Sequence, residues 1–258
     1  MAGPSELDAM RRAVELSRAV LGTTSPNPPV GAVVLDAAGA VVGEGATQPP
    51  GGPHAEVVAL RQAGDAARGG TAVVTLEPCR HVGRTGPCTQ ALLDAAVARV
   101  VVACADPTAD AGGGAEELRA HGVVVETGVL VDEVALGPLE AWLACHRLGR
   151  PFVTWKYAAT LDGRSAAADG TSRWVTGEAA RADVHRLRGE VDAGVAGVGT
   201  VLADDRCSPP ARTPATSRCA SSSTAPVGRR SRPAPCPVHV RRSWPCAATS
   251  TPAPTPSS

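Results

Sequence analysis

Four residues with the chemistry of a metal site lie close together in the sequence. His54 and Glu56 are separated by one residue, and Cys79 and Cys88 follow with eight residues between them. One imidazole and two thiolates would give Zn²⁺ three protein ligands and leave the fourth tetrahedral position for water. Zinc lowers the pKa of such a water from about 15.7 to about 7, which makes hydroxide available at neutral pH. Glu56 need not bind the metal, and its carboxylate could carry a proton from that water to a substrate nitrogen.

The same residues could instead build a structural zinc site, which normally has four protein ligands. Cys104 and Cys145 are candidates for the fourth, but one falls in a predicted strand and the other late in a predicted helix. An isolated cysteine is also commonly an inert buried residue. We favour an open, catalytic site because His54 opens a predicted helix and Cys79 follows a predicted strand, as in the zinc deaminases. Those enzymes usually separate their two cysteines by two residues, which is not the spacing found in this chain.

Hydrophobic periodicity predicts the elements that hold these residues. A helix is predicted over 6–22, and the prolines of 23–29 prevent it from continuing. The predicted strands are 30–35 and 41–45, which form a hairpin, and then 71–76, 99–103 and 123–126. Further helices are predicted over about 54–62, 87–97, 115–121 and 131–147. Apolar strands separated by helices are typical of a mostly parallel sheet covered on both faces, so the sequence predicts a three-layer α/β/α domain.

A second region begins after residues 149–151, where Gly and Pro mark a boundary. A strand is predicted over 152–157, a helix over 178–188 and a strand, weakened by glycines, over 191–201. The pattern stops after residue 205. Residues 206–258 contain eleven Pro, ten Ser, four Cys and no Leu, which predicts a disordered tail.

The formal net charge of zero is the sum of two unlike segments. Residues 206–258 carry eight arginines and no acidic residue, whereas the preceding 205 residues hold 17 basic and 25 acidic groups. The acidic body gives no reason to expect a nucleic-acid partner. The chain starts without the basic and apolar stretches of a signal peptide, and its longest apolar runs are strand-sized, so we expect a cytoplasmic protein without a membrane segment. With one Phe, one Tyr and four Trp, the core must consist mainly of Val, Leu and Ala.

Several motifs together resemble the bifunctional riboflavin-biosynthesis deaminase/reductases. The deaminase-like stretches are SPNPPVG at 25–31, PHAEV at 53–57 and EPCRHVGRTGPC at 77–88, whose long spacing between the cysteines is a mark of that branch. The reductase-like stretches are KYAATLDGR at 156–164, SRWVT at 172–176 and GTVLADD at 199–205. The resemblance covers roughly residues 6–205, with the motifs of both halves in the expected order.

The resemblance implies a cytidine-deaminase-like domain at 1–148 that deaminates 2,5-diamino-6-ribosylamino-4(3H)-pyrimidinone 5′-phosphate. It implies that His54, Cys79 and Cys88 bind zinc, with Glu56 as the catalytic proton shuttle. Three further residues are implied substrate contacts, namely Asn27 in the proline-flanked loop and His81 and Arg84 between the two cysteines. Family members commonly have a histidine where this chain has Thr47. A homo-oligomer is also implied.

The resemblance further implies part of a dihydrofolate-reductase-like domain at 149–205, which in the family binds NADPH. The matching positions are Ala158, Trp174, Thr200 and Asp204 for the cofactor and Ser172 and Arg188 for the substrate. The family pattern breaks off at 206, so we expect the reductase activity to be lost. We interpret 206–258 as the product of a shifted reading frame, with a genuine basic tail as the alternative.

Two other functions stay open on the sequence alone. One is a different zinc deaminase acting on cytidine, guanine or tRNA adenosine, although these commonly carry Pro-Cys-x-x-Cys. The other is a zinc-stabilised scaffold without enzymatic activity, whose partners would meet the basic tail.

Overall fold

The computed structural model describes residues 1–81, 86–172 and 174–197. These fall into two compact units, of which the first contains Met1–Phe152 and the second begins at Val153. The predicted disordered tail and the positions Arg84, Thr200 and Asp204 lie outside the described residues. No helix in the described ranges is long and apolar enough to span a lipid bilayer.

A mixed five-stranded sheet forms the centre of the first unit. Its strands are β1 (Gly31–Leu35), β2 (Val41–Ala46), β3 (Thr71–Leu76), β4 (Arg99–Cys104) and β5 (Val124–Thr127), in the order β2-β1-β3-β4-β5. The predicted β1–β2 hairpin is confirmed, and β3, β4 and β5 run parallel. The prediction of a mostly parallel sheet is wrong where β1 meets β3, because these two strands also pair antiparallel.

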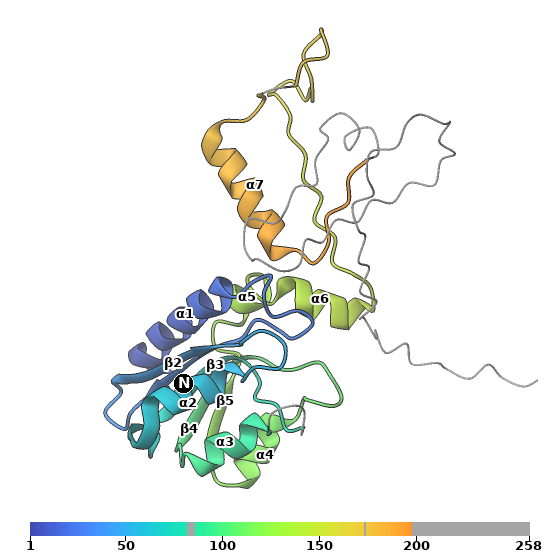
Figure 1. The fold of residues 1–258 in the computed structure, drawn as a ribbon. Helices are drawn as coiled ribbons and strands as arrows, with labels where there is room; N and C mark the ends of the chain where they lie inside the picture. Colours follow the sequence, from blue (N-terminus) through green and yellow to red (C-terminus); the bar gives the residue numbers. More distant parts are fainter. Residues whose placement is uncertain (82–85, 173, 198–258) are drawn as a thin grey trace, which may run out of the picture. The chain divides into compact units, whose positions relative to one another are not determined.

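Helices cover both faces of this sheet, which confirms the predicted three-layer arrangement. The helices of the first unit are α1 (Pro4–Ala19), α2 (Ala55–Ala63), α3 (Cys88–Asp94), α4 (Gly114–Ala120), α5 (Val131–Ala135) and α6 (Glu140–Leu148), and the 3₁₀ turn η1 (Gly64–Ala67) follows α2. Helices α1, α5 and α6 lie on one face, and α2, α3 and α4 lie on the other (Figure 1). The sheet therefore lies between the two helical layers (Figure 1).

Glycines allow α2 to lie unusually close to the edge strand β2. A Cβ atom at Gly43 would lie 2.2 Å from the carbonyl oxygen of Ala59, and one at Gly45 would lie 2.2 Å from that of Ala55. Both distances are shorter than any real carbon–oxygen contact, so a larger residue at either position would push the helix away. This close packing fixes the start of α2, where His54 and Glu56 lie.

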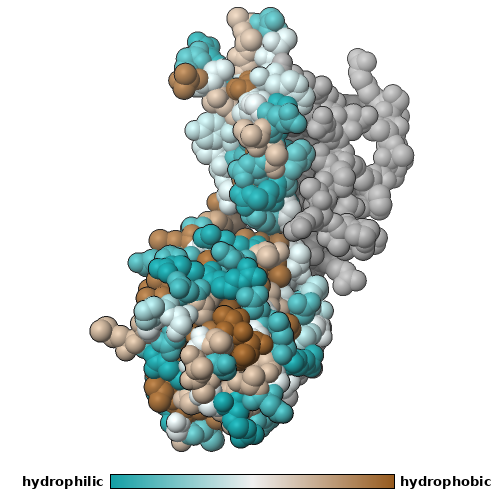
Figure 2. Space-filling model, turned by 90° about the vertical axis from the view of Figure 1, so that its left-hand side faces the viewer, coloured by the Kyte–Doolittle hydropathy of each residue, from teal (hydrophilic) through white to brown (hydrophobic). Residues whose placement is uncertain are grey.

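Aliphatic side chains fill the core, as the composition predicts. Most of the large, fully buried residues of the sheet are valines, namely Val33, Val34, Val73, Val74, Val100, Val101 and Val102. The surface is more polar than this core. On the face shown in Figure 2, hydrophilic residues surround patches of hydrophobic residues.

The predicted long helix over 131–147 is wrong, because the structure divides it into α5 and α6. Gly137 and Pro138 lie between the two helices. Proline disfavours helical geometry in the residue before it and offers no N–H group to the preceding turn. Because of this break, α5 and α6 are two separate helices.

The second unit contains one helix and no strand among its described residues. The predicted helix is confirmed as α7 (Glu178–Glu190), which buries none of its side chains. The strand predicted over 152–157 is wrong, since these residues are extended and exposed, with Trp155 81% accessible. The described part of the strand predicted over 191–201 contains one isolated bridge residue, Gly194, and no strand. A strand needs a continuous ladder of hydrogen bonds to a neighbour, and the described residues of this unit form none.

Candidate metal centre

Three elements of the first unit bring the predicted zinc ligands together. His54 is the N-cap residue of α2, with extended backbone angles that turn its side chain out of the helix. Cys79 lies in the loop that follows β3, and Cys88 is the first residue of α3. Both cysteines are buried and His54 is half-buried.

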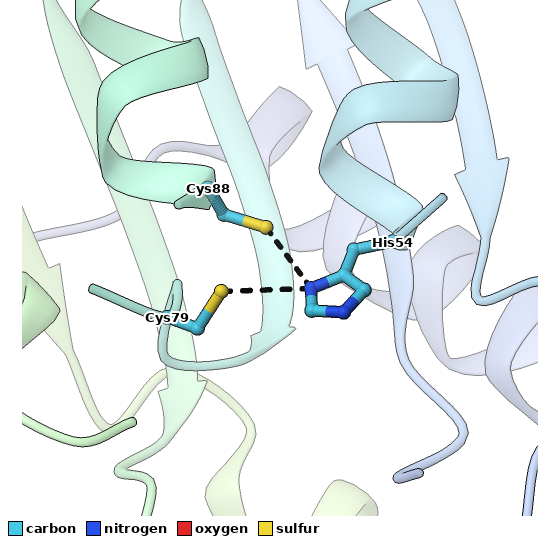
Figure 3. A group of neighbouring side chains, drawn as sticks. All are labelled: His54, Cys79 and Cys88. Carbon is cyan, nitrogen blue, oxygen red and sulfur yellow. Dashed lines mark hydrogen bonds between the residues drawn. The ribbon is translucent and has the colours of Figure 1, made fainter. Parts of the chain in front are cut away.

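The ligand atoms have the separations that a tetrahedral zinc ion needs. The Nδ1 atom of His54 lies 3.3 Å from the Sγ atom of Cys88 and 3.5 Å from that of Cys79 (Figure 3). All three ligand atoms lie within 4.8 Å of one another. Bonds of about 2.05 Å to nitrogen and 2.3 Å to sulfur at tetrahedral angles place these atoms about 3.6 Å apart. The two nitrogen–sulfur distances therefore fit a tetrahedral zinc ion.

Hydrogen bonds among the three side chains shift the pKa of each of them. Hydrogen bonds from Cys88 and His54 lower the pKa of Cys79 to about 4, against the opposing effect of burial. The hydrogen bond to Cys79, together with burial, raises the pKa of Cys88. The hydrogen bond with Cys79 also raises the pKa of His54. A thiolate at Cys79 attracts a cation directly, whereas Cys88 must lose its proton when a metal binds.

Glu56 is a buried carboxyl group next to the three ligands. It is the second residue of α2 and is 5% exposed. Burial is the main cause that raises its pKa, because the charged form is poorly solvated there. Such a carboxyl group can hold a proton under conditions in which an exposed one has lost it.

A cavity of about 300 Å³ adjoins this cluster, although Cys88 is not part of its wall. It is lined by five of the predicted site residues, namely Asn27, His54, Glu56, Cys79 and His81. Further polar and aromatic residues that were not predicted as site residues also line the cavity, and they include Glu77, Asp106, Thr108, Asp110, Trp142 and His146. The cavity thus joins the ligand cluster to residues that lie far from it in the sequence.

Two family models match the chain. The model of the cytidine and deoxycytidylate deaminase zinc-binding region matches residues 5–104, and that of the RibD C-terminal domain matches residues 151–234. The riboflavin biosynthesis protein RibD of Mycobacterium tuberculosis H37Rv is 54% identical over 233 residues, which make up 88% of this chain and 67% of that protein. The chain belongs to the RibD family.

Solved RibD structures resemble the fold as well. Acinetobacter baumannii RibD has a TM-score of 0.72 at 46% identity, covering 78% of this chain and 56% of that one. The diaminohydroxyphosphoribosylaminopyrimidine deaminase/5-amino-6-(5-phosphoribosylamino)uracil reductase of Thermotoga maritima has a TM-score of 0.74 at 42% identity, covering 78% and 58%. This chain therefore spans between about half and two thirds of the RibD relatives that it matches.

The match to the RibD C-terminal domain extends beyond residue 205, so the prediction that the family pattern breaks off at 206 is wrong. Similarity to the family therefore continues into the basic segment 206–258. Its interpretation as the product of a shifted reading frame stays a prediction, and so do the domain boundaries at 148 and 205.

The remaining RibD-type positions among the described residues belong to the second unit. These are Ala158, Ser172, Trp174 and Arg188. Trp174 is exposed and lies under the guanidinium group of Arg181, 4.3 Å from its ring centroid, while Ser172 and Arg188 are exposed. Their roles toward NADPH and substrate stay predictions.

Two hydrogen bonds hold the proline-rich loop of the RibD-like site, one to a side chain and one within the backbone. Thr47, at the position where family members commonly have histidine, is buried and its hydroxyl accepts the N–H of Val30 at 3.1 Å. The backbone N–H of Asn27 donates to the carbonyl of Thr24 at 2.9 Å. Both contacts stabilise the proline-rich loop that forms one wall of the cavity.

Glu77 connects the end of β3 to the loop that follows β4. Its carboxylate accepts the backbone N–H of Ala115 at 2.9 Å and that of Asp106 at 3.1 Å. Asp106 in turn accepts two hydrogen bonds from Thr108, through its backbone N–H at 2.8 Å and its hydroxyl at 2.6 Å. Glu77 thereby positions the loop whose residues line the cavity.

We expect Glu77→Ala to lower the free energy of unfolding by about 2–4 kcal/mol, because two largely buried N–H groups lose their acceptor. Urea denaturation of the zinc-loaded chain measures the change. Glu77→Gln keeps one carbonyl oxygen and should lose about half as much. Glu116→Ala, at an exposed position of α4, is the control and should change stability by less than about 0.5 kcal/mol. Equal stabilities of the Glu77→Ala and Glu116→Ala variants would show that Glu77 does not hold the loop.

Proposed function

We propose that the first unit catalyses the zinc-dependent hydrolytic deamination of a pyrimidine ribosyl phosphate in riboflavin biosynthesis. The observation that carries the proposal is the convergence of His54, Cys79 and Cys88 next to the buried carboxyl group of Glu56, with His54, Cys79 and Glu56 in the wall of a cavity. Zinc held there would supply hydroxide at neutral pH for attack on the ring carbon that bears the amine. The residues around it must orient the ring and move protons.

Glu56 is the residue suited to the proton transfers. Its carboxylate would accept the proton of the attacking water and deliver it to a ring nitrogen, and then assist the departure of ammonia. Burial raises its pKa, so the protonated form needed between these transfers is favoured. Glu56 lies on the first turn of α2, which begins directly after His54. The helix therefore fixes the position of Glu56 relative to this ligand.

A catalytic role is favoured over a structural one by the number of ligands. Three His and Cys ligand atoms converge among the described residues, and neither Cys104 nor Cys145 joins them. A structural zinc site would normally be closed by a fourth protein ligand, whereas a catalytic one keeps a position for water. The cavity beside the cluster is of a size that admits a small molecule.

The substrate is proposed from the relatives. The Thermotoga maritima relative is a diaminohydroxyphosphoribosylaminopyrimidine deaminase. For this chain we propose 2,5-diamino-6-ribosylamino-4(3H)-pyrimidinone 5′-phosphate, with Asn27 and His81, both on the cavity wall, as contacts. The homo-oligomer, the cytoplasmic location, the absence of a nucleic-acid partner and the role of Arg84 stay predictions.

Ammonia release by the purified, zinc-loaded full chain tests the proposal. We expect turnover of the ribosylaminopyrimidine phosphate and none above background with cytidine or guanine. Turnover of cytidine or guanine alone would assign the chain to another class of zinc deaminase. Absence of turnover with all three, in a chain shown to contain zinc, would favour the scaffold.

A further inference from the structure

The cavity extends from the ligand cluster to a helix on the other face of the sheet. Its wall includes Trp142 and His146, which lie one turn apart on α6. Helices α2 and α3, which carry His54 and Cys88, belong to the opposite helical layer (Figure 1). A molecule that fills the cavity therefore reaches from the metal centre to the side chains of α6.

Trp142 is held in place by its neighbours. Its ring is partly buried and packs against the hydrophobic core of the first unit. On its other side the imidazole of His146 lies with its centroid 4.1 Å from the indole centroid, at an angle of 36°. The Nδ1 atom of His146 lies 2.9 Å from the carbonyl oxygen of Trp142, which fixes the orientation of the imidazole. The two rings thus form an aromatic part of the cavity wall.

The chemistry of the proposed substrate indicates what this wall contacts. Deamination requires the ring carbon that bears the amine to lie at the ligand cluster, which determines where the pyrimidine binds. The ribosylamino group projects from that ring and must occupy the part of the cavity away from the ligands. An aromatic face gives a sugar an apolar contact surface, and a side chain that is already ordered loses little entropy on binding.

We propose that Trp142, held by His146, contacts the ribosyl group of the substrate and selects the ribosylated pyrimidine over the free base. This inference rests on the proposed function, since it needs the pyrimidine to bind at the ligand cluster. It makes α6 part of the substrate site, although no zinc ligand or proton carrier lies on that helix.

Substitution of Trp142 tests the inference. We expect Trp142→Ala to raise KM for the ribosylaminopyrimidine phosphate about tenfold and to change kcat less than about twofold. The free base, 2,5,6-triamino-4-pyrimidinone, should be bound and deaminated as well by the variant as by the parent chain. Trp142→Phe keeps an aromatic face and should restore most of the affinity. Leu148→Ala, at an exposed position of α6 outside the cavity, is the matched control and should behave as the parent.

Binding measured without turnover separates this inference from the proposed function. Calorimetric titration of the zinc-loaded Glu56→Gln chain, with and without Trp142→Ala, gives Kd for both pyrimidines. A tenfold loss confined to the ribosylated compound supports the inference even if the wild-type chain releases no ammonia, which would contradict only the proposed function. An equal loss for both compounds, or an unchanged Kd for the ribosylated one, overturns the role of Trp142. Thermal unfolding of each variant shows whether a loss reflects a damaged fold.

Discussion

Glu56→Gln is expected to lower the rate of ammonia release by about 10³-fold and to leave the zinc content unchanged. The amide has nearly the shape of the carboxyl group and can occupy the same buried position, which is 5% exposed in the native chain. It cannot accept and return a proton, so the water stays unactivated and the amine leaves without protonation. Steady-state ammonia release and atomic absorption on the same sample measure the two effects.

The matched control for Glu56→Gln is Glu116→Gln, the same change at an exposed position outside the cavity. It should leave both rate and zinc content unchanged. If Glu56→Gln turned over substrate at the parent rate, Glu56 could not be the proton carrier. If it lost zinc together with activity, Glu56 would support the metal site and its part in proton transfer would remain without evidence.

The ligand cluster could be predicted because its signals are local. Residues 71–76 form an apolar run that follows Gly70, and β3 has these bounds in the structure. His54 was predicted to open a helix and is the N-cap of α2. Once a strand and a helix start are fixed, the residue types at 54, 79 and 88 are enough to suggest a metal site.

The rest of the cavity could not be predicted because it depends on tertiary packing. Trp142 and His146 lie more than fifty residues after Cys88, on a helix whose direction follows from the break at Gly137 and Pro138. The direction of β1 was missed for a related reason. All five of its residues are buried, and a strand without alternation carries no signal that distinguishes parallel from antiparallel neighbours.

The second unit shows the limit of local reasoning. The segment 152–157 has the β-branched and aromatic residues typical of strands, yet it is extended and exposed in the structure. A strand forms only where a neighbouring strand offers hydrogen-bonding partners. The strand propensity of single residues does not reveal whether such a neighbour exists. Helix α7 needs no such partner, because its hydrogen bonds are internal, and it forms where the sequence predicts it.

Cys88→Ala is expected to weaken zinc binding by more than about 100-fold, since loss of a direct ligand should exceed the 10- to 100-fold effect of its supporting groups. Only two of the three ligands, His54 and Cys79, would then remain. Because the side chain of Cys88 is fully buried, a group from the protein surface cannot easily take its place as a ligand. Deamination should be lost at zinc concentrations that saturate the parent chain. Competition with a chromophoric chelator measures the affinity.

Cys104→Ala is the control for Cys88→Ala, because Cys104 is an equally buried cysteine outside the ligand cluster. It should retain one tightly bound zinc and respond to a chelator as the parent does. Since a metal that binds only the folded chain stabilises it, the chelator should lower the Tm of the parent and of Cys104→Ala but not that of Cys88→Ala. Zinc bound by Cys88→Ala as tightly as by the parent would show that the three side chains do not form the site. A chelator effect on the Tm of all three proteins would point to a metal bound elsewhere in the chain.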